Sequence, residues 1–234
     1  MQRIGTAGWS VPKGADVEGT HLQRYSRTLR CTEINSTFYR VHRASTFVRW
    51  SAETPADFRF SIKAPKTLTH EAKLLDPEPL LEGFLQQIAP LQGKMGPLLF
   101  QLPPSLHFQP AIAEEFLAVF RRLYSGEGVL EPRHESWFTP QVDQLLKEYA
   151  MARVAADPAK GAPQAAEPGG YSGFVYHRLH GSPQTYYSEY AEDFLAKLAR
   201  KIKAHENVWI IFDNTALSHA YPNALRLQQL TGEI

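Results

Sequence analysis

The sequence has almost no net charge, one cysteine and no long apolar run. Lysine and arginine number 25 and aspartate and glutamate 24, so the formal charge is +1, and we expect no binding to extended nucleic-acid duplexes. Cys31 has no second cysteine for a disulfide within the chain, which predicts a reducing compartment, the cytoplasm. No run approaches the roughly 18 apolar residues of a membrane-spanning helix, so no membrane partner is expected. Residues 1–5 lead directly into a strand-like segment, so no secretory signal is expected either.

The remaining composition is that of an ordinary globular protein. Hydrophobic residues make up 43% and charged residues 21% of the 234 positions, which excludes a disordered chain. No internal repeat of fixed period is present. We therefore expect a single domain that spans residues 1–234.

Short apolar or β-branched segments alternate with segments of helical periodicity along the chain. The predicted strands are 3–9, 31–37, 59–64, 97–102, 128–133, 152–157, 174–180 and 208–213. The predicted helices are 21–29, 44–53, 80–88, 111–123, 141–149, 190–205 and 222–230. Eight βα units of about 29 residues each predict a (β/α)8 barrel of the TIM type. A doubly wound open sheet is the alternative, but the first unit lacks the glycine-rich turn of that fold.

One connection departs from the alternation. Segment 158–170, between the sixth and seventh predicted strands, has three prolines and three glycines in thirteen residues. This composition excludes a regular helix. We expect a long loop in place of the helix, lying over one mouth of the barrel as a lid; a domain linker is the alternative.

Polar side chains gather toward the carboxyl ends of the predicted strands. These residues are Trp9, Glu33, Asn35, Lys63, Gln101, Glu131, Arg133, Asp157, Arg178, His180, Asp213 and Asn214. Side chains alternate along a strand, so Glu33, Asn35 and Thr37 are predicted to share one face, as are Arg178 and His180. Because barrel enzymes build their active sites where the strands end, we expect these groups to meet there. Mutually satisfied ion pairs without any chemistry are the alternative.

Eight short segments form a more specific pattern. They are GTAGWS (5–10), EINSTFY (33–39), FSIKAP (60–65), TH (69–70), LFQLPPS (99–105), EPRHESWF (131–138), RLHG (178–181) and FDNT (212–215). In this order, from about residue 3 to residue 230, they resemble the domain of unknown function 72 family, the YecE-like proteins. The resemblance implies a βα barrel and supplies no reaction. Pro132 and Asp213 depart from the pattern, where an aromatic or apolar residue and an asparagine are expected.

The basic residues at the strand ends predict an anionic small-molecule ligand, phosphorylated or nucleotide-like. Guanidinium groups bind phosphate or carboxylate through paired hydrogen bonds, amides can orient a ligand, and an aromatic ring can stack on it. The predicted ligand-binding residues are Trp9, Asn35, Lys63, Gln101, Arg133, Arg178 and Asn214.

The acidic residues predict acid–base chemistry of a hydrolase or isomerase type. A carboxylate pair can act as general acid and base, and histidine titrates near neutrality. The predicted catalytic residues are Glu33, Glu131, Asp157 and His180.

Three alternatives stay open at this point. The carboxylates and His180 can also hold a divalent cation, although no metal-binding spacing such as HExxH is present and no other cofactor is implied, since both GxGxxG and the phosphate loop are missing. A non-catalytic protein that binds a nucleotide or single-stranded nucleic acid is the second alternative, and a protein-interaction scaffold is the third. The oligomeric state is not predicted.

Overall fold

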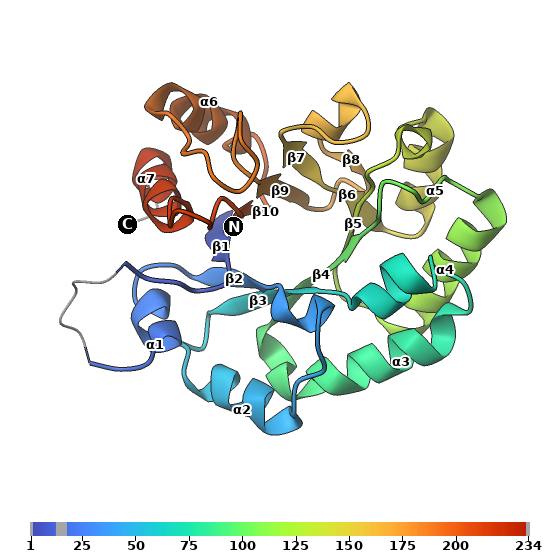
Figure 1. Cartoon of the computed structure of the whole chain (residues 1–234), viewed down its shortest axis with the longest axis horizontal. Coiled ribbons are helices and arrows are strands. Elements are labelled where there is room, and N and C mark those ends of the chain that lie inside the picture. The colour runs from blue at the N-terminus through green and yellow to red at the C-terminus, as the bar shows by residue number, and fades with distance from the viewer. Residues whose placement is uncertain (1, 13–17, 233–234) are drawn as a thin grey trace.

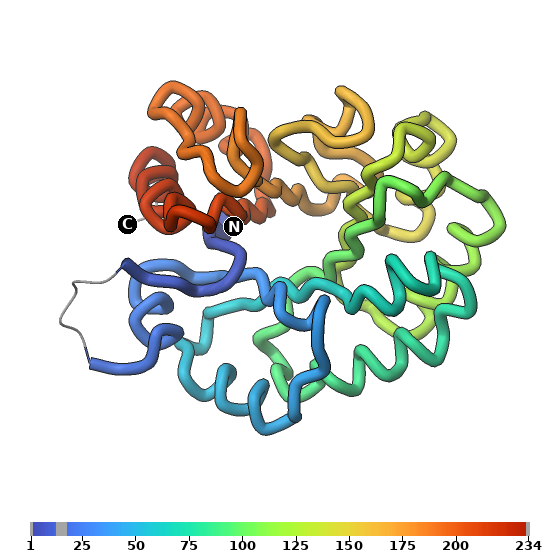
Figure 2. Tube along the Cα trace, in the orientation of Figure 1, coloured from blue at the N-terminus to red at the C-terminus, as the bar shows by residue number. Residues whose placement is uncertain are grey.

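The computed structural model describes residues 2–12 and 18–232, which form one curved, mostly parallel sheet with helices around its outside (Figure 1). The strands are β1 (Gln2–Ala7), β2 (Cys31–Ile34), β3 (Arg59–Lys63), β4 (Met95–Gln101), β5 (Gly128–Glu131), β6 (Met151–Arg153), β7 (Ala155–Asp157), β8 (Gly169–Gly170), β9 (Val175–Leu179) and β10 (Val208–Phe212). Their order in the sheet is β7-β9-β10-β1-β2-β3-β4-β5-β6-β8. The first and last long strands, β1 and β10, lie side by side, as the trace in Figure 2 shows.

The helices occupy all seven predicted places. They are α1 (His21–Ser26), α2 (Ala44–Ala52), α3 (Pro77–Ile88), α4 (Pro110–Leu123), α5 (Pro140–Glu148), α6 (Glu192–Ile202) and α7 (Ala220–Thr231). Proline is the first residue of α3, α4 and α5, where its missing N–H and fixed φ favour a helix start. Within the described part of the chain, no helix has the length and apolarity needed to cross a bilayer.

The barrel prediction is confirmed, although the nearly closed sheet has ten strands and not the eight strands of eight regular βα units. The segment predicted as the sixth strand is divided at Val154: β6 pairs with β5, and β7 pairs with β9. The chain thus changes partners within one segment, and this change brings the two ends of the sheet together. Segment 158–170 forms no α-helix; it contains a short 3-10 turn, η5 (Pro163–Ala166), and β8, which runs antiparallel to β6.

Three predicted strands extend two or more residues too far, and the first of them, 3–9, ends at Ala7. The segment 31–37 ends as a strand at Ile34, because Asn35 adopts helical φ and ψ of −89° and −19° and the 3-10 turn η1 (Ser36–Phe38) follows. The expectation that Glu33, Asn35 and Thr37 share one strand face is therefore wrong. The segment 128–133 ends as a strand at Glu131, directly before Pro132, which has no N–H to donate to a neighbouring strand.

Apolar side chains pack on both sides of the sheet. The larger cluster lies between the sheet and the helices and includes Phe60, Phe100 and Phe212. A smaller cluster fills the barrel interior and includes Leu99, Val129, Val154, Trp209 and Ile211. The inward positions of β10 are therefore Trp209 and Ile211, and the next inward position along the chain is Asp213.

We predict that Gly5→Ala destabilises the barrel by about 1–3 kcal/mol or more, because β1 approaches β2 closely here. A Cβ at position 5 would lie 2.1 Å from the carbonyl oxygen of Cys31, and a backbone atom cannot move aside cheaply. Urea unfolding measures the change. Gly83→Ala is the control, because position 83 is an exposed position of α3 where the added methyl group would meet no atom within 4 Å. We expect this substitution to stabilise the fold by about 0.5–1 kcal/mol. Equal effects of the two substitutions would contradict the close approach.

Candidate functional site

Arg178 stands at the centre of a buried ionic network inside the carboxyl end of the barrel. Its side chain is 1% exposed. Nε and Nη2 donate to the two oxygens of Glu33 at 3.0 and 2.7 Å. Nη1 donates to Glu131 at 2.6 Å, and Nη2 also donates to Asp213 at 3.1 Å. One guanidinium group thus joins carboxylates from β2, from β5 and from the end of β10.

His180 bridges two of these carboxylates. Its Nδ1 lies 3.0 Å from Oδ2 of Asp213 and its Nε2 lies 3.0 Å from Oε1 of Glu131. A neutral imidazole carries only one N–H, whereas each contact to an ionised carboxylate needs a proton. For both contacts to be hydrogen bonds to ionised carboxylates, the three groups must hold one proton more than a neutral ring and two carboxylates. We name Glu33, Glu131, Arg178, His180 and Asp213 the mouth cluster.

Neighbouring cations offset the effect of burial on the pKa of two acids in the mouth cluster. Burial by itself raises the pKa of Glu131, but Arg178, Arg133 and His180 together bring that pKa well below its usual value. The same opposition lowers the pKa of Asp213, where Arg178 and the hydrogen bond from His180 outweigh burial. Both carboxylates are consequently held in the ionised form.

Tyr176 forms a buried hydrogen bond with the mouth cluster. Its hydroxyl lies 2.9 Å from Oε2 of Glu33 and 2.7 Å from Oγ of Ser61. Burial, and next the charge of Glu33, raise the pKa of Tyr176 well above its usual value, so the phenol keeps its proton for this hydrogen bond. Glu33 therefore has all its contacts inside the protein and is fixed in position.

Two further cations lie beside the mouth cluster. Nζ of Lys63, at the end of β3, lies 4.1 Å from the ring centroid of Phe38, and no carboxylate in the described residues is within ion-pair distance of it. Burial, and next the charge of Arg178, lower the pKa of Lys63 to about 8. Arg133 donates from Nη2 to Glu131 at 2.8 Å, but its buried Nε has no hydrogen-bond partner.

A cavity of about 560 Å³ opens where β1 and β2 end, and we call it the mouth cavity. It is lined by Ala7, Gly8, Trp9, Ser10, His21, Asn35, Ser36, Arg40 and Trp50. Ala7 is the register partner of Glu33, so the mouth cavity adjoins the mouth cluster. Oδ1 of Asn35 is buried without a hydrogen-bond partner among the described residues. The rings of Trp9 and Trp50 pack edge to face, with their centroids 4.9 Å apart.

The structure brings six of the predicted residues together around Arg178 and its acids: Glu33, Lys63, Glu131, Arg133, Arg178 and His180. Trp9 and Asn35 lie in the adjoining mouth cavity. Gln101 ends β4, next to Glu131 in register.

Two predicted residues face elsewhere. Asp157 pairs in register with Leu179 and accepts a hydrogen bond from the hydroxyl of Tyr190 at 2.9 Å, so its side chain lies outside the mouth cluster. Asn214 donates from Nδ2 to the carbonyl of Ser188 and to Asn223, and it ties loops together there.

Sequence reasoning gave no site role to Arg40, His21 or Trp50. It named Asp213 among the strand-end carboxylates but left it out of the predicted catalytic residues. Asp213 follows β10 directly, and the alternation that singled out Arg178 and His180 also places it inward. Arg40 and Trp50 belong to the segment after β2, so the rule that the loops after strands form the mouth points to this region. Only the folded chain shows that they line the same cavity as Trp9.

The loop 158–170 approaches the site from the side of β5. A Cβ at Gly161 would lie 2.8 Å from the backbone of Arg133, and Nζ of Lys160 donates to Thr185 at 3.2 Å.

A site for a divalent cation was one of the alternatives left open by the sequence. The described residues contain no group of three or more histidine, cysteine, aspartate or glutamate side chains arranged to hold a metal ion.

Comparison with known proteins assigns the chain to a family. Residues 3–234 match the family described as Protein of unknown function DUF72. The chain is 35% identical over 125 residues to the UPF0759 protein YecE of Escherichia coli K12, a match that covers 50% of this chain and 46% of YecE. It is 30% identical over 156 residues to the UPF0759 protein YunF of Bacillus subtilis 168, covering 60% and 53%. The chain thus spans about half the length of the curated relatives it matches.

Two solved structures share the fold. A DUF72 family protein from Enterococcus faecalis V583 superimposes with a TM-score of 0.82 at 21% identity, covering 99% of this chain and 96% of that one. A DUF72 family protein from Thermotoga maritima MSB8 gives a TM-score of 0.78 at 25% identity, covering 99% of both chains.

We predict that Arg178→Met costs about 3–5 kcal/mol of stability at pH 7, because it leaves buried carboxylates without their counter-ion. In the unmodified protein the acids have lowered pKa values, so their stabilisation is present at neutral pH and is lost as the pH falls below about 4.5. In the variant, uncompensated burial raises the same pKa values, and stability is expected to increase as the pH falls from 7 toward 5. Unfolding free energies across this range measure both slopes.

The control for this prediction is Arg226→Met, which removes an exposed ion pair with Glu192 and should have a much smaller effect. Parallel pH profiles for Arg178→Met and the unmodified protein would contradict the account of the mouth cluster.

Proposed function

We propose that this chain, which belongs to the DUF72 family of proteins of unknown function, is an enzyme that binds a small anionic molecule at the carboxyl end of its barrel and transfers a proton to or from it. The observation that carries the proposal is the position of His180 between Glu131 and Asp213, with a nitrogen 3.0 Å from each carboxylate. A purely structural core has no need of a shared proton at this depth.

Within the mouth cluster, His180 and Asp213 are the proposed proton-transfer pair. His180 is fully buried, whereas the side chain of Asp213 is 11% exposed and Glu131 only 2%. A proton exchanged with a ligand therefore passes through Asp213, and His180 takes it up or supplies it. Arg178 and Glu33 have their polar atoms engaged with one another, and we assign them a positioning role. Arg178 was predicted to bind the anion directly, but its buried guanidinium is directed at carboxylates.

The anion itself is assigned to Lys63 and Arg133. Lys63 carries a charge without an ion-pair partner among the described residues, and Nε of Arg133 is an unused donor. The unpartnered Oδ1 of Asn35 can accept a hydrogen bond from the ligand, which favours an anion that also carries hydroxyl or N–H groups. A phosphorylated sugar or a nucleotide has both, and the mouth cavity adds Arg40 for the charge.

A binding protein without turnover is the second candidate. The contact between Trp9 and Trp50 beside Arg40 in the mouth cavity favours it, since indole rings and a guanidinium are suited to stack on a nucleobase. This candidate and the enzyme share the ligand class and differ in whether the ligand is chemically changed.

We predict that anion binding weakens as the pH rises through about 8. Lys63 is charged below its pKa of about 8 and loses its attraction for an anion above it. Isothermal titration calorimetry with inorganic phosphate and glucose 6-phosphate between pH 6.5 and 9.5 tests this. Lys63→Met should weaken binding at pH 7 about tenfold or more and remove the loss of affinity above pH 8.

The matched control for Lys63 is Lys66→Met. Lys66 is an exposed lysine three positions away that pairs with Glu71, and its loss should leave binding unchanged. Phosphate affinity that is the same in the unmodified protein and in Lys63→Met would contradict the assignment of the anion to this site.

We predict that His180→Gln lowers turnover by about 10²–10⁴-fold while binding is kept. Glutamine can hydrogen-bond one of the two carboxylates but cannot carry the proton. Incubation with a panel of phosphorylated sugars and nucleotides, followed by mass spectrometry of the products, finds the reaction, and calorimetry measures binding. Ligands that bind and are recovered unchanged across the panel would favour the second candidate.

A further inference from the structure

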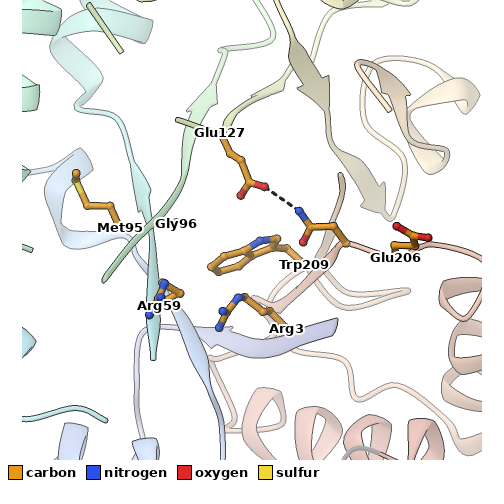
Figure 3. A pocket seen from close by; sticks show the side chains of 8 residues that line it. Arg3, Arg59, Met95, Gly96, Glu127, Glu206 and Trp209 are labelled. Carbon is orange, nitrogen blue, oxygen red and sulfur yellow. Dashed lines mark hydrogen bonds between the residues drawn. The ribbon is translucent and has the colours of Figure 1, made fainter. Parts of the chain in front are cut away.

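A second cavity, of about 420 Å³, lies at the amino end of the barrel, where the strands begin. Figure 3 shows the guanidinium groups of Arg3 and Arg59 on one side of the Trp209 indole and the Glu127 carboxylate on the other. The inward residues of β10 run from Trp209 through Ile211 to Asp213, about 13 Å along a strand. This amino-end cavity is therefore separate from the mouth cluster.

The two guanidinium groups of the amino-end cavity are held by backbone carbonyls. Nη1 of Arg3 donates to Asp57 at 3.1 Å. Nη1 of Arg59 donates to Ala56 and Phe58, at 2.9 Å in both cases. These bonds fix the orientation of both groups and leave Nε and Nη2 of each without an acceptor in the described part of the protein.

The carboxylates of the amino-end cavity are also without an ionic partner among the described residues. Glu127 accepts a hydrogen bond from Asn207 at 2.8 Å, and neither Glu127 nor Glu206 lies within ion-pair distance of Arg3 or Arg59. Burial raises the pKa of Glu127 and lowers the pKa of Arg3. Each charge would therefore be stabilised by an opposite charge entering the cavity.

We propose that the amino-end cavity binds a free α-amino acid. The carboxylate of the ligand meets Arg3 and Arg59, and its ammonium group meets Glu127 and Glu206. The Trp209 ring is only 2% exposed, with Arg3 over it and Tyr176 stacked against it, so the recognition rests on the charges and not on the indole. A zwitterion satisfies both signs of charge at once, whereas a simple anion would leave the carboxylates of the cavity unpaired. The proposal is independent of the function assigned to the carboxyl end.

Calorimetry with L-leucine as the probe tests the proposal. N-acetyl-L-leucine lacks the ammonium charge and L-leucine methyl ester lacks the carboxylate, and we expect each to bind about tenfold or more weakly than L-leucine. This comparison uses the unmodified protein and so does not depend on whether a variant folds. Equal binding of the three compounds, or no binding of L-leucine at millimolar concentration, overturns the proposal.

Variants locate the binding in the cavity. Arg3→Met and Glu127→Gln should each weaken L-leucine about tenfold to a hundredfold. Arg30→Met is the matched control, because Arg30 is an exposed arginine that pairs with Asp57 and does not line the cavity. Lys63→Met, at the other end of the barrel, should also leave L-leucine binding unchanged. Unaltered affinity in folded Arg3→Met and Glu127→Gln would show that the amino acid binds elsewhere.

Discussion

The arrangement of the carboxyl end depends on the guanidinium group of Arg178. Three carboxylates buried in one barrel would repel one another and lower the stability of the fold unless a counter-ion lay between them. Arg178 supplies that charge and four hydrogen bonds to Glu33, Glu131 and Asp213. The planar, forked guanidinium suits this task better than an ammonium group, because its donors point in fixed directions. His180 can then lie between two ionised acids and donate a proton to each of its two contacts.

Much of the fold could be predicted from the sequence, since strand and helix periodicities are local. The seven helices and the polar strand ends follow from residue order alone. The division of β6 from β7 could not be predicted, because a change of sheet partner at Val154 is decided by barrel closure. The strand end at Ile34 was missed because Asn35 and Ser36 are compatible with either a strand or a turn. The strand end at Glu131 was also missed, although Pro132, which has no N–H to donate to a neighbouring strand, directly follows it.

The sequence indicated which residues gather at the candidate site better than it indicated what each residue does there. Alternation along β9 placed Arg178 and His180 on the same face, and the contacts of both with Asp213 agree with this. Which donor meets which acceptor depends on three-dimensional approach. For this reason Arg178 looked like an anion-binding residue in the sequence and lies bound to acids in the structure. Asp213 occupies a position where the family resemblance leads one to expect asparagine, and an amide there could accept a hydrogen bond but could not hold a proton.

The central claim is that His180, Glu131 and Asp213 share an additional proton. Neutron crystallography of the perdeuterated protein at neutral pH tests it most directly, because it locates deuterium between heavy atoms. The account predicts deuterium in both contacts, between Nδ1 and Asp213 and between Nε2 and Glu131. A contact without deuterium would show a neutral imidazole with one nitrogen facing an acid unprotonated, and the proposed proton transfer at the carboxyl end would be contradicted.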